Sequence, residues 1–254
     1  MSRSITYTAL DDIPLVEPGD DVAAIVLGAL EAQHIILEQD DVVVLAQKIV
    51  SKAENRYVRL SDVTPSARAV ELAATIGKDP RHIEVVLRES TEVVRYRQNV
   101  MIVAHRLGFV MANAGIDESN IDHQGSGRLL LLPEDPDRTC ADIKARIDQA
   151  HGVSVGVIIN DSFGRPWRNG VVGVALGAAG IPALQSMIGT KDLFGRELRI
   201  TEIAIADELA AAASLVMGQG DEGTPVIHVR GFKSTAAHNR ASSLARPKHM
   251  DMFR

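Results

Sequence analysis

Cysteine and several common functional motifs are scarce or missing in this sequence of 254 residues. Cys140 is its only cysteine, which excludes an intramolecular disulfide and any zinc or iron–sulfur site that needs several cysteines. The eight histidines show no H-x-x-x-H or comparable ligand spacing, which disfavours a zinc hydrolase. A Walker loop, G-x-x-x-x-G-K-[ST], is absent, and no G-x-G-x-x-G pattern follows an expected strand. The familiar P-loop and Rossmann folds are therefore disfavoured.

Long apolar runs and an excess of positive charge are also missing. The uncharged run at residues 170–188 is interrupted by glycines, Pro182, Gln185 and Ser186, so we expect no membrane-spanning segment. Residues 1–8 lack the cationic and apolar regions of a secretory signal, and we expect a cytoplasmic protein. With 33 acidic and 27 basic residues the net charge is −6, so we expect no nucleic-acid partner. An anionic ligand would have to meet local cations.

Periodicity of the apolar residues predicts a mixture of helices and strands. We expect helices over residues 20–31, 65–76 with Thr64 as N-cap and Gly77 as stop, 137–149 and 207–217, and one that begins at Pro80. We expect strands over residues 41–46, 100–104, 109–112, 128–132, 154–159, 198–204 and 225–229. Because strands and helices do not alternate one for one, we predict an α+β or mixed α/β fold with mixed sheets. Residues 233–254 are polar and are expected to form a tail.

Two segments that follow or neighbour expected strands carry polar side chains of a kind found in binding loops. In residues 47–54, Lys48 and Lys52 are suited to phosphate oxygens, although a solvated basic turn explains them as well. In residues 113–120, Asp117 and Asn120 are suited to a hard cation or a nucleotide. An ordinary Asx-turn is the competing interpretation of this second segment.

The segment of residues 160–170 is the strongest local signal. It follows a strand expected to be buried on both faces, and its Asp161 and Ser162 are suited to Mg²⁺ or Mn²⁺. Arg165 and Arg168 are suited to phosphate, and Trp167 offers a stacking face; a capped turn with two surface arginines is the alternative.

Glycines mark a fourth segment, residues 217–223, and would let backbone amides approach a ligand, although a helix C-cap explains Gly218 equally well. In residues 189–197, Lys191 and Arg196 could meet anions, but an exposed charged turn is the simpler interpretation.

Six phrases occur in an order that resembles the coenzyme F420-0:L-glutamate ligase family: VSKAENR, NAGIDESN, NDSFGRPWRNG, GTKDLFGREL, ADELAAAASLVMGQGD and PVIHVRGF. The resemblance extends from Ile13 to Phe232 and implies a ligase domain over residues 1–232, with one or two lobes. Members of this family join L-glutamate to the lactyl carboxylate of F420-0, some add γ-linked glutamates, and GTP is hydrolysed to GDP. The resemblance also implies an unusual mixed α/β fold, an intertwined homodimer, a requirement for Mg²⁺ or Mn²⁺, and stimulation by K⁺.

The resemblance assigns roles to particular positions. The residues implied to contact GTP are Ile13, Pro14, Leu15, Val16, Gln47, Lys48, Lys52, Asn120, Ser214, Leu215, Val216, Met217, Gly218, Gln219, Gly220 and Asp221. Asp117 and Asp161 are implied to share one metal ion, with Ser162 and Gln219 near a second. Gln219 stands where an acid can occur in the family, which weakens the second site. Our hypothesis is that Lys52, with Arg165 or Arg168, stabilises charge on the transferring phosphoryl group.

Two alternatives stay open. A related nucleotide-dependent ligase with another acceptor would keep the same metal and phosphate residues. A non-catalytic module that binds a deazaflavin or a nucleotide is the alternative from a different class, and the presence of Lys52, Asp117 and Asp161 argues against it.

Overall fold

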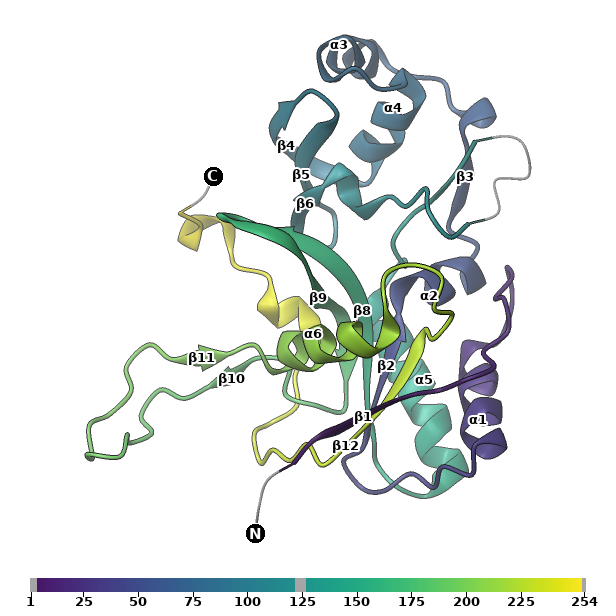
Figure 1. The fold of residues 1–254 in the computed structure, drawn as a ribbon. Helices are drawn as coiled ribbons and strands as arrows, with labels where there is room; N and C mark the ends of the chain where they lie inside the picture. Colours follow the sequence, from purple (N-terminus) through teal and green to yellow (C-terminus); the bar gives the residue numbers. More distant parts are fainter. Residues whose placement is uncertain (1–3, 122–126, 253–254) are drawn as a thin grey trace.

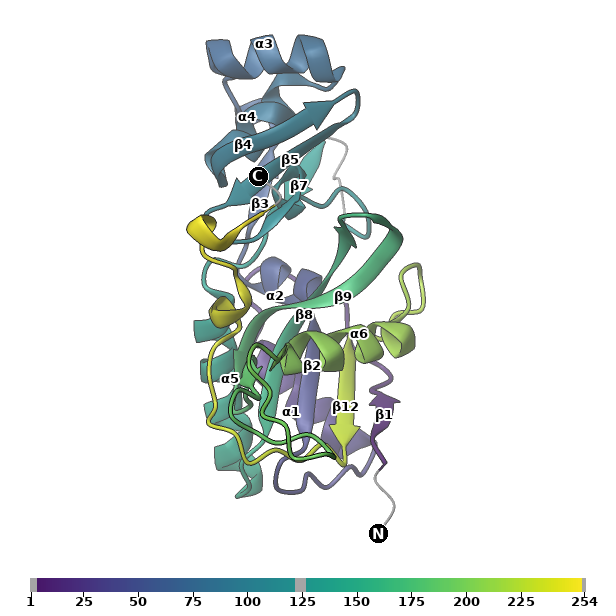
Figure 2. The same cartoon turned by 90° about the vertical axis from the view of Figure 1, so that its left-hand side faces the viewer.

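The computed structural model describes residues 4–121 and 127–252. Its main body is built on a mixed sheet with helices on both faces, and a smaller lobe, formed mainly by the chain between α2 and α5, stands at one end (Figures 1 and 2). This architecture confirms the predicted mixed α/β class. None of the helices in these two ranges is long and apolar enough to cross a membrane.

The main sheet has five strands in the order β1-β12-β2-β8-β9. These strands are β1 (Thr6–Ala9), β2 (Val42–Ala46), β8 (Gly156–Arg165), β9 (Arg168–Ala179) and β12 (Val226–Arg230). Only β2 and β8 pair in parallel, and the other pairs are antiparallel. The sequence VVVLA of β2 is apolar at every position because helices cover both faces of this central strand.

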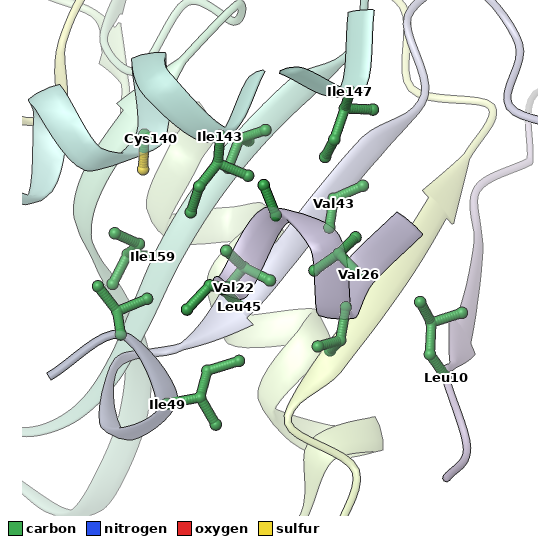
Figure 3. Close-up of a cluster of buried hydrophobic side chains, with 14 of the residues drawn as sticks. Leu10, Val22, Val26, Val43, Leu45, Ile49, Cys140, Ile143, Ile147 and Ile159 are labelled. Atoms are coloured by element: carbon green, nitrogen blue, oxygen red, sulfur yellow. The ribbon is translucent and has the colours of Figure 1, made fainter. Parts of the chain in front are cut away.

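Two separate cores flank this sheet. The helices of the main body are α1 (Val22–Ala32), α2 (Gln47–Ala53), α5 (Pro136–His151) and α6 (Ile205–Met217). On one face, Val43 and Leu45 pack with apolar residues of α1, α2 and α5, as Figure 3 shows, while on the other face Val42 and Val44 pack against α6. Cys140 of α5 is fully buried in the first core, and burial raises the pKa of its thiol well above the usual range. It is a packing residue, not a reactive thiol.

The smaller lobe has its own apolar clusters. Its elements are β3 (Tyr57–Arg59), η1 (Leu60–Asp62), α3 (Ala67–Ile76), α4 (Pro80–Arg88), β4 (Ser90–Arg97), β5 (Val100–His105), β6 (Val110–Ala112), η2 (Asn113–Gly115) and β7 (Arg128–Leu130). The predicted cap of α3 was wrong by two residues: the Ser66 hydroxyl, not Thr64, accepts the N–H of Ala69. Gly77, in the left-handed conformation, ends this helix as predicted, and Asp79 caps the helix that begins at Pro80.

A long arm and a wrapped C-terminal segment complete the main body. The arm contains β10 (Gln185–Ser186) and β11 (Glu202–Ile203) and reaches away from the sheet (Figure 1). The predicted strand over residues 198–204 was too long, because regular strand pairing is confined to Glu202 and Ile203 and Ile200 is exposed. The C-terminal segment forms η3 (Ala241–Leu244) and η4 (Lys248–Met250). Ala241 is fully buried and its N–H binds Asp137, so this part of the expected tail packs on the body.

Candidate active site

A pocket of about 530 Å³ lies at the edge of the main sheet where β2 ends. Several segments of the chain meet there: the one that follows β1, the carboxyl ends of the parallel strands β2 and β8, and the one that precedes β12. In sheets with parallel strands, ligands bind at the carboxyl ends, where the connections diverge. The lining comes from residues 13–17, 46–49, 52, 57, 120–121, 128, 160–162 and 217–225. Segments more than two hundred residues apart in the sequence therefore form one cavity.

Two carboxylates stand beside each other at one side of the pocket. Asp161 lies on β8 and lines the cavity, whereas Asp117, which pairs through its backbone with Leu130 of β7, lies outside the lining. Burial, followed by the charge of Asp117, raises the pKa of Asp161 to about 7. Burial also raises the pKa of Asp117, although the nearby charge of Lys48, 2.9 Å from Asp117 Oδ1, opposes the shift. Two acids whose charges oppose each other's ionisation form a site that favours a cation.

The donor atoms of this acid pair suit a hard divalent ion. Asp117 Oδ2 is buried and has no hydrogen-bond partner in the described part of the chain. Asp161 Oδ1 accepts the N–H of Ser162 at 2.8 Å. Within the same ranges, no group of three or more His, Cys, Asp or Glu side chains could hold a metal. Mg²⁺ binds through one or two carboxylates and completes its shell with water and substrate phosphates, so two acids fit this ion.

Helix α2 supplies the two lysines of the pocket. It begins directly after β2, which places Lys48 and Lys52 on successive turns at the pocket wall. Burial lowers the pKa of Lys52. The charge of Glu17 opposes this shift, and the charge of Lys48 adds to it. Gln47, also on this helix, is buried and its amide donates to the Ser51 hydroxyl at 3.0 Å. The segment predicted to be a loop at residues 47–54 is thus a helix, which holds its two lysines more rigidly than a turn would.

The other expected loop, residues 160–170, is also regular structure. Residues 160–165 continue β8, residues 168–170 begin β9, and Arg165 pairs with Arg168 at the end of this hairpin. Asp161 and Ser162 line the pocket, but neither arginine belongs to its described lining. Arg165 lies four residue steps after Asp161, about 13 Å along the extended strand. The lining therefore contains the predicted acid and neither of the two arginines, whose role in phosphate binding stays a prediction.

Most of the remaining predicted residues meet at the pocket. Ile13, Pro14, Leu15 and Val16 form one wall, and Asn120 reaches across to donate to the Gly220 carbonyl at 3.0 Å. Met217, Gly218, Gln219, Gly220 and Asp221 also line the pocket. Three predicted residues lie on α6 outside the described lining: Ser214, Leu215 and Val216. Ser214 is buried and its hydroxyl accepts from the Asn160 amide, while Leu215 points to solvent, because a helix can turn only part of its surface toward a cavity.

Sequence reasoning missed six polar residues of the lining: Glu17, Tyr57, Arg128, Asn160, Glu222 and Thr224. The guanidinium of Arg128 lies 3.7 Å from the centre of the Tyr57 ring, a cation–π contact between β7 and β3. These strands are far apart in the sequence, so no local pattern could have joined the two residues. Asn160 could have been found, because it directly precedes Asp161 on the same strand.

The fold and the pocket are those of a particular class of protein. It is a mixed α/β protein with an enzyme-like cleft, in which two lysines lie beside a pair of acids. The sequence profile of the F420-0:Gamma-glutamyl ligase family matches residues 12–231. The chain belongs to this family.

Curated relatives cover nearly the whole chain. The "Coenzyme F420:L-glutamate ligase" of Methanopyrus kandleri is 45% identical, over 96% of this chain and 97% of the relative. The protein of the same name from Methanothermobacter thermautotrophicus is 43% identical, over 98% and 99%. That from Methanocaldococcus jannaschii is 44% identical, over 96% and 94%.

Proposed function

We propose that this chain is a GTP-dependent ligase that forms an amide between the lactyl carboxylate of coenzyme F420-0 and the amino group of L-glutamate. Membership in the family and the names of the relatives support ligation of glutamate to this coenzyme. Addition of further γ-linked glutamates belongs to the same proposal. The observation that carries the proposal is that Asp161, Lys48 and Lys52 line one pocket and that Asp117 contacts Lys48 beside it.

The chemistry explains why a nucleotide is needed. A carboxylate is a poor acyl donor because attack by an amine would have to expel oxide. In the proposed first step, an oxygen of the lactyl carboxylate forms a bond to the γ-phosphorus, the bond to the β,γ-bridging oxygen breaks, and GDP leaves. In the second step, the glutamate nitrogen bonds to the acyl carbon of this acyl phosphate and inorganic phosphate leaves. The ammonium group of glutamate must lose a proton to become a nucleophile, and we assign the role of proton acceptor to solvent or to the departing phosphate.

The residues of the pocket have separate roles in this proposal. Asp117 and Asp161 would hold Mg²⁺ or Mn²⁺, which supplies neutralisation of phosphate charge when bound. Ser162 and Gln219 are the candidates for a second ion. Lys52, whose half-buried ammonium faces the cavity, stabilises charge on the transferring group, and Lys48 can exchange its contact with Asp117 for phosphate.

The test is a reaction of the purified protein with F420-0, L-glutamate, Mg²⁺ or Mn²⁺, and either GTP or ATP. We expect glutamyl products, counted by mass, in step with GDP release. The variant Asp161→Ala should lose ligation while keeping its fold by circular dichroism, whereas Glu71→Ala, an exposed acid on α3, should react normally. Tight GTP binding without product would indicate a different acceptor, and normal turnover by Asp161→Ala would refute the metal assignment.

We also propose a homodimer and stimulation by K⁺. Leu193 and Phe194 on the arm are 99% and 95% exposed, together with Ile188 and Ile200, and a second copy would remove these apolar side chains from water. Light scattering of the wild type and of Phe194→Asp tests the dimer, with a lower mass expected for the variant. Assays in potassium and sodium chloride of equal concentration test the ion.

A further inference from the structure

The loop that follows α6 has an unusual backbone. Residues 218–223 place glycine at the first, third and sixth positions, and here the pattern follows a helix instead of a strand. Gly218 has φ +75° and ψ −177°, a conformation essentially confined to glycine. The whole loop lines the pocket, and the Asn120 amide, which also lines it, donates to the Gly220 carbonyl at 3.0 Å. This conformation allows successive backbone N–H groups to point to one place.

An acidic side chain of the same loop occupies that place. The N–H of Gly220 donates to Glu222 Oε2 at 2.7 Å. Hydrogen bonds from the backbone N–H groups of Glu222, Gly220 and Gln219 lower the pKa of this carboxyl group. A side chain at position 218 would overlap the same carboxyl group, so the glycine also leaves room for it. The loop is thus a nest of amides that already holds an anion.

The occupant of this nest is exchangeable. Glu222 is exposed, so its carboxylate can turn into water and remain fully hydrated. Lys52 and Lys48 line the same cavity, so an anion that enters from solvent meets positive charge together with the amides. A phosphate group offers more oxygens and more negative charge than a carboxylate and suits the same donors.

We propose that Glu222 is an internal occupant of a phosphate-binding nest and that it thereby weakens and tunes the affinity of the pocket for nucleotides. A nucleotide phosphate displaces the carboxylate from the amides, and the side chain turns to solvent. The inference rests on the nucleotide of the proposed function. The competing role is purely structural: Glu222 would hold the loop in shape for a ligand bound elsewhere. The two roles predict opposite effects when the carboxylate is removed.

Binding measurements on the full chain separate them. GTP and inorganic tripolyphosphate are titrated into the wild type and Glu222→Gln by calorimetry, without acceptor or glutamate. If the carboxylate fills the nest most of the time, its loss should lower the dissociation constants of both probes by about fivefold or more. Weaker or unchanged binding by Glu222→Gln would overturn the inference in favour of the structural role.

Two further variants separate occupancy from charge. Glu222→Asp keeps the charge but shortens the side chain by one methylene, so it should leave the nest and bind the probes nearly as tightly as Glu222→Gln. Asp221→Asn removes one charge from the same loop without emptying the nest, and its gain should be smaller. Equal gains for Asp221→Asn and Glu222→Gln, or wild-type affinity for Glu222→Asp, would refute the displacement. No binding of GTP by the wild type would overturn the proposed nucleotide and this inference together.

Discussion

Replacement of Glu89 by glutamine should destabilise the protein in a way that depends on pH. Glu89 follows α4 at the junction of the two lobes, and its side chain is 13% exposed. Its Oε2 lies 2.9 Å from Arg56 Nη2 and 3.1 Å from Arg106 Nε, and His105 Nε2 is 3.6 Å away. Arg56 also donates to the Leu132 carbonyl at 2.8 Å. One carboxylate therefore neutralises two guanidinium groups from separate segments.

The size of the effect follows from the pKa of Glu89. Burial opposes ionisation, but the contact with His105 and the charges of Arg56 and Arg106 outweigh it and lower the pKa from 4.5 to about 2. At 1.36 kcal/mol for each pKa unit, the ionised group contributes about 3 kcal/mol to the free energy of unfolding. Because the folded pKa is depressed, this contribution is complete well above pH 4.5. It falls to about 2 kcal/mol near pH 3.5 and is lost as the pH approaches 2.

Urea denaturation of wild type and Glu89→Gln at pH 7 and pH 3.5 measures the effect. The difference in unfolding free energy should be about 3 kcal/mol at pH 7 and clearly smaller at pH 3.5. The matched control is Glu134→Gln, which removes a 67% exposed partner of the same arginines and should cost less than about 1 kcal/mol. A difference below 1 kcal/mol for Glu89→Gln at pH 7, or one that grows as the pH falls, would refute the reasoning.

Two further substitutions test a structural and a functional acid. Asp41 is 2% exposed and lies 2.7 Å from Arg230 and 2.8 Å from His228. Asp41→Asn should therefore lower the free energy of unfolding by about 3 kcal/mol. A decrease below 1 kcal/mol in urea denaturation would contradict the role of this buried cluster. Asp161→Asn removes a negative charge that Asp117 repels, so at pH 8 in EDTA the variant should melt at a higher temperature than the wild type. Added Mg²⁺ should raise the melting temperature of the wild type only. A lower melting temperature for Asp161→Asn would contradict the repulsion.

Local sequence patterns predicted the elements that depend on local interactions. The start of α4 at Pro80, the glycine that ends α3, the apolar strand β2 and the alanine-rich α6 all follow from neighbouring residues. The segment after β2 was misread because its lysines and serine resemble a turn, whereas Ile49 and Val50 fix it as a helix by packing into the core.

Long-range pairing explains the other differences. The polar residues 160–165 extend β8 because β9 supplies hydrogen bonds along the whole hairpin. Arg128 and Tyr57 meet only because β7 pairs with β3, a contact that no nearby residue signals. Asp117 and Asp161 were each found because a carboxylate after an expected strand is a recognisable local signal, and the resemblance paired them. Only the fold shows that Lys48 lies 2.9 Å from Asp117 and lines the cavity.

Isotope transfer tests the central claim most directly. F420-0 whose lactyl carboxylate carries ¹⁸O is incubated with the protein, GTP, Mg²⁺ and L-glutamate, and the released phosphate is analysed by mass. Ligation through an acyl phosphate predicts one labelled oxygen in phosphate for each amide formed, because the carboxylate oxygen leaves with the phosphoryl group. Amide formation with unlabelled phosphate would contradict the acyl phosphate, and GTP hydrolysis without amide would contradict the ligase.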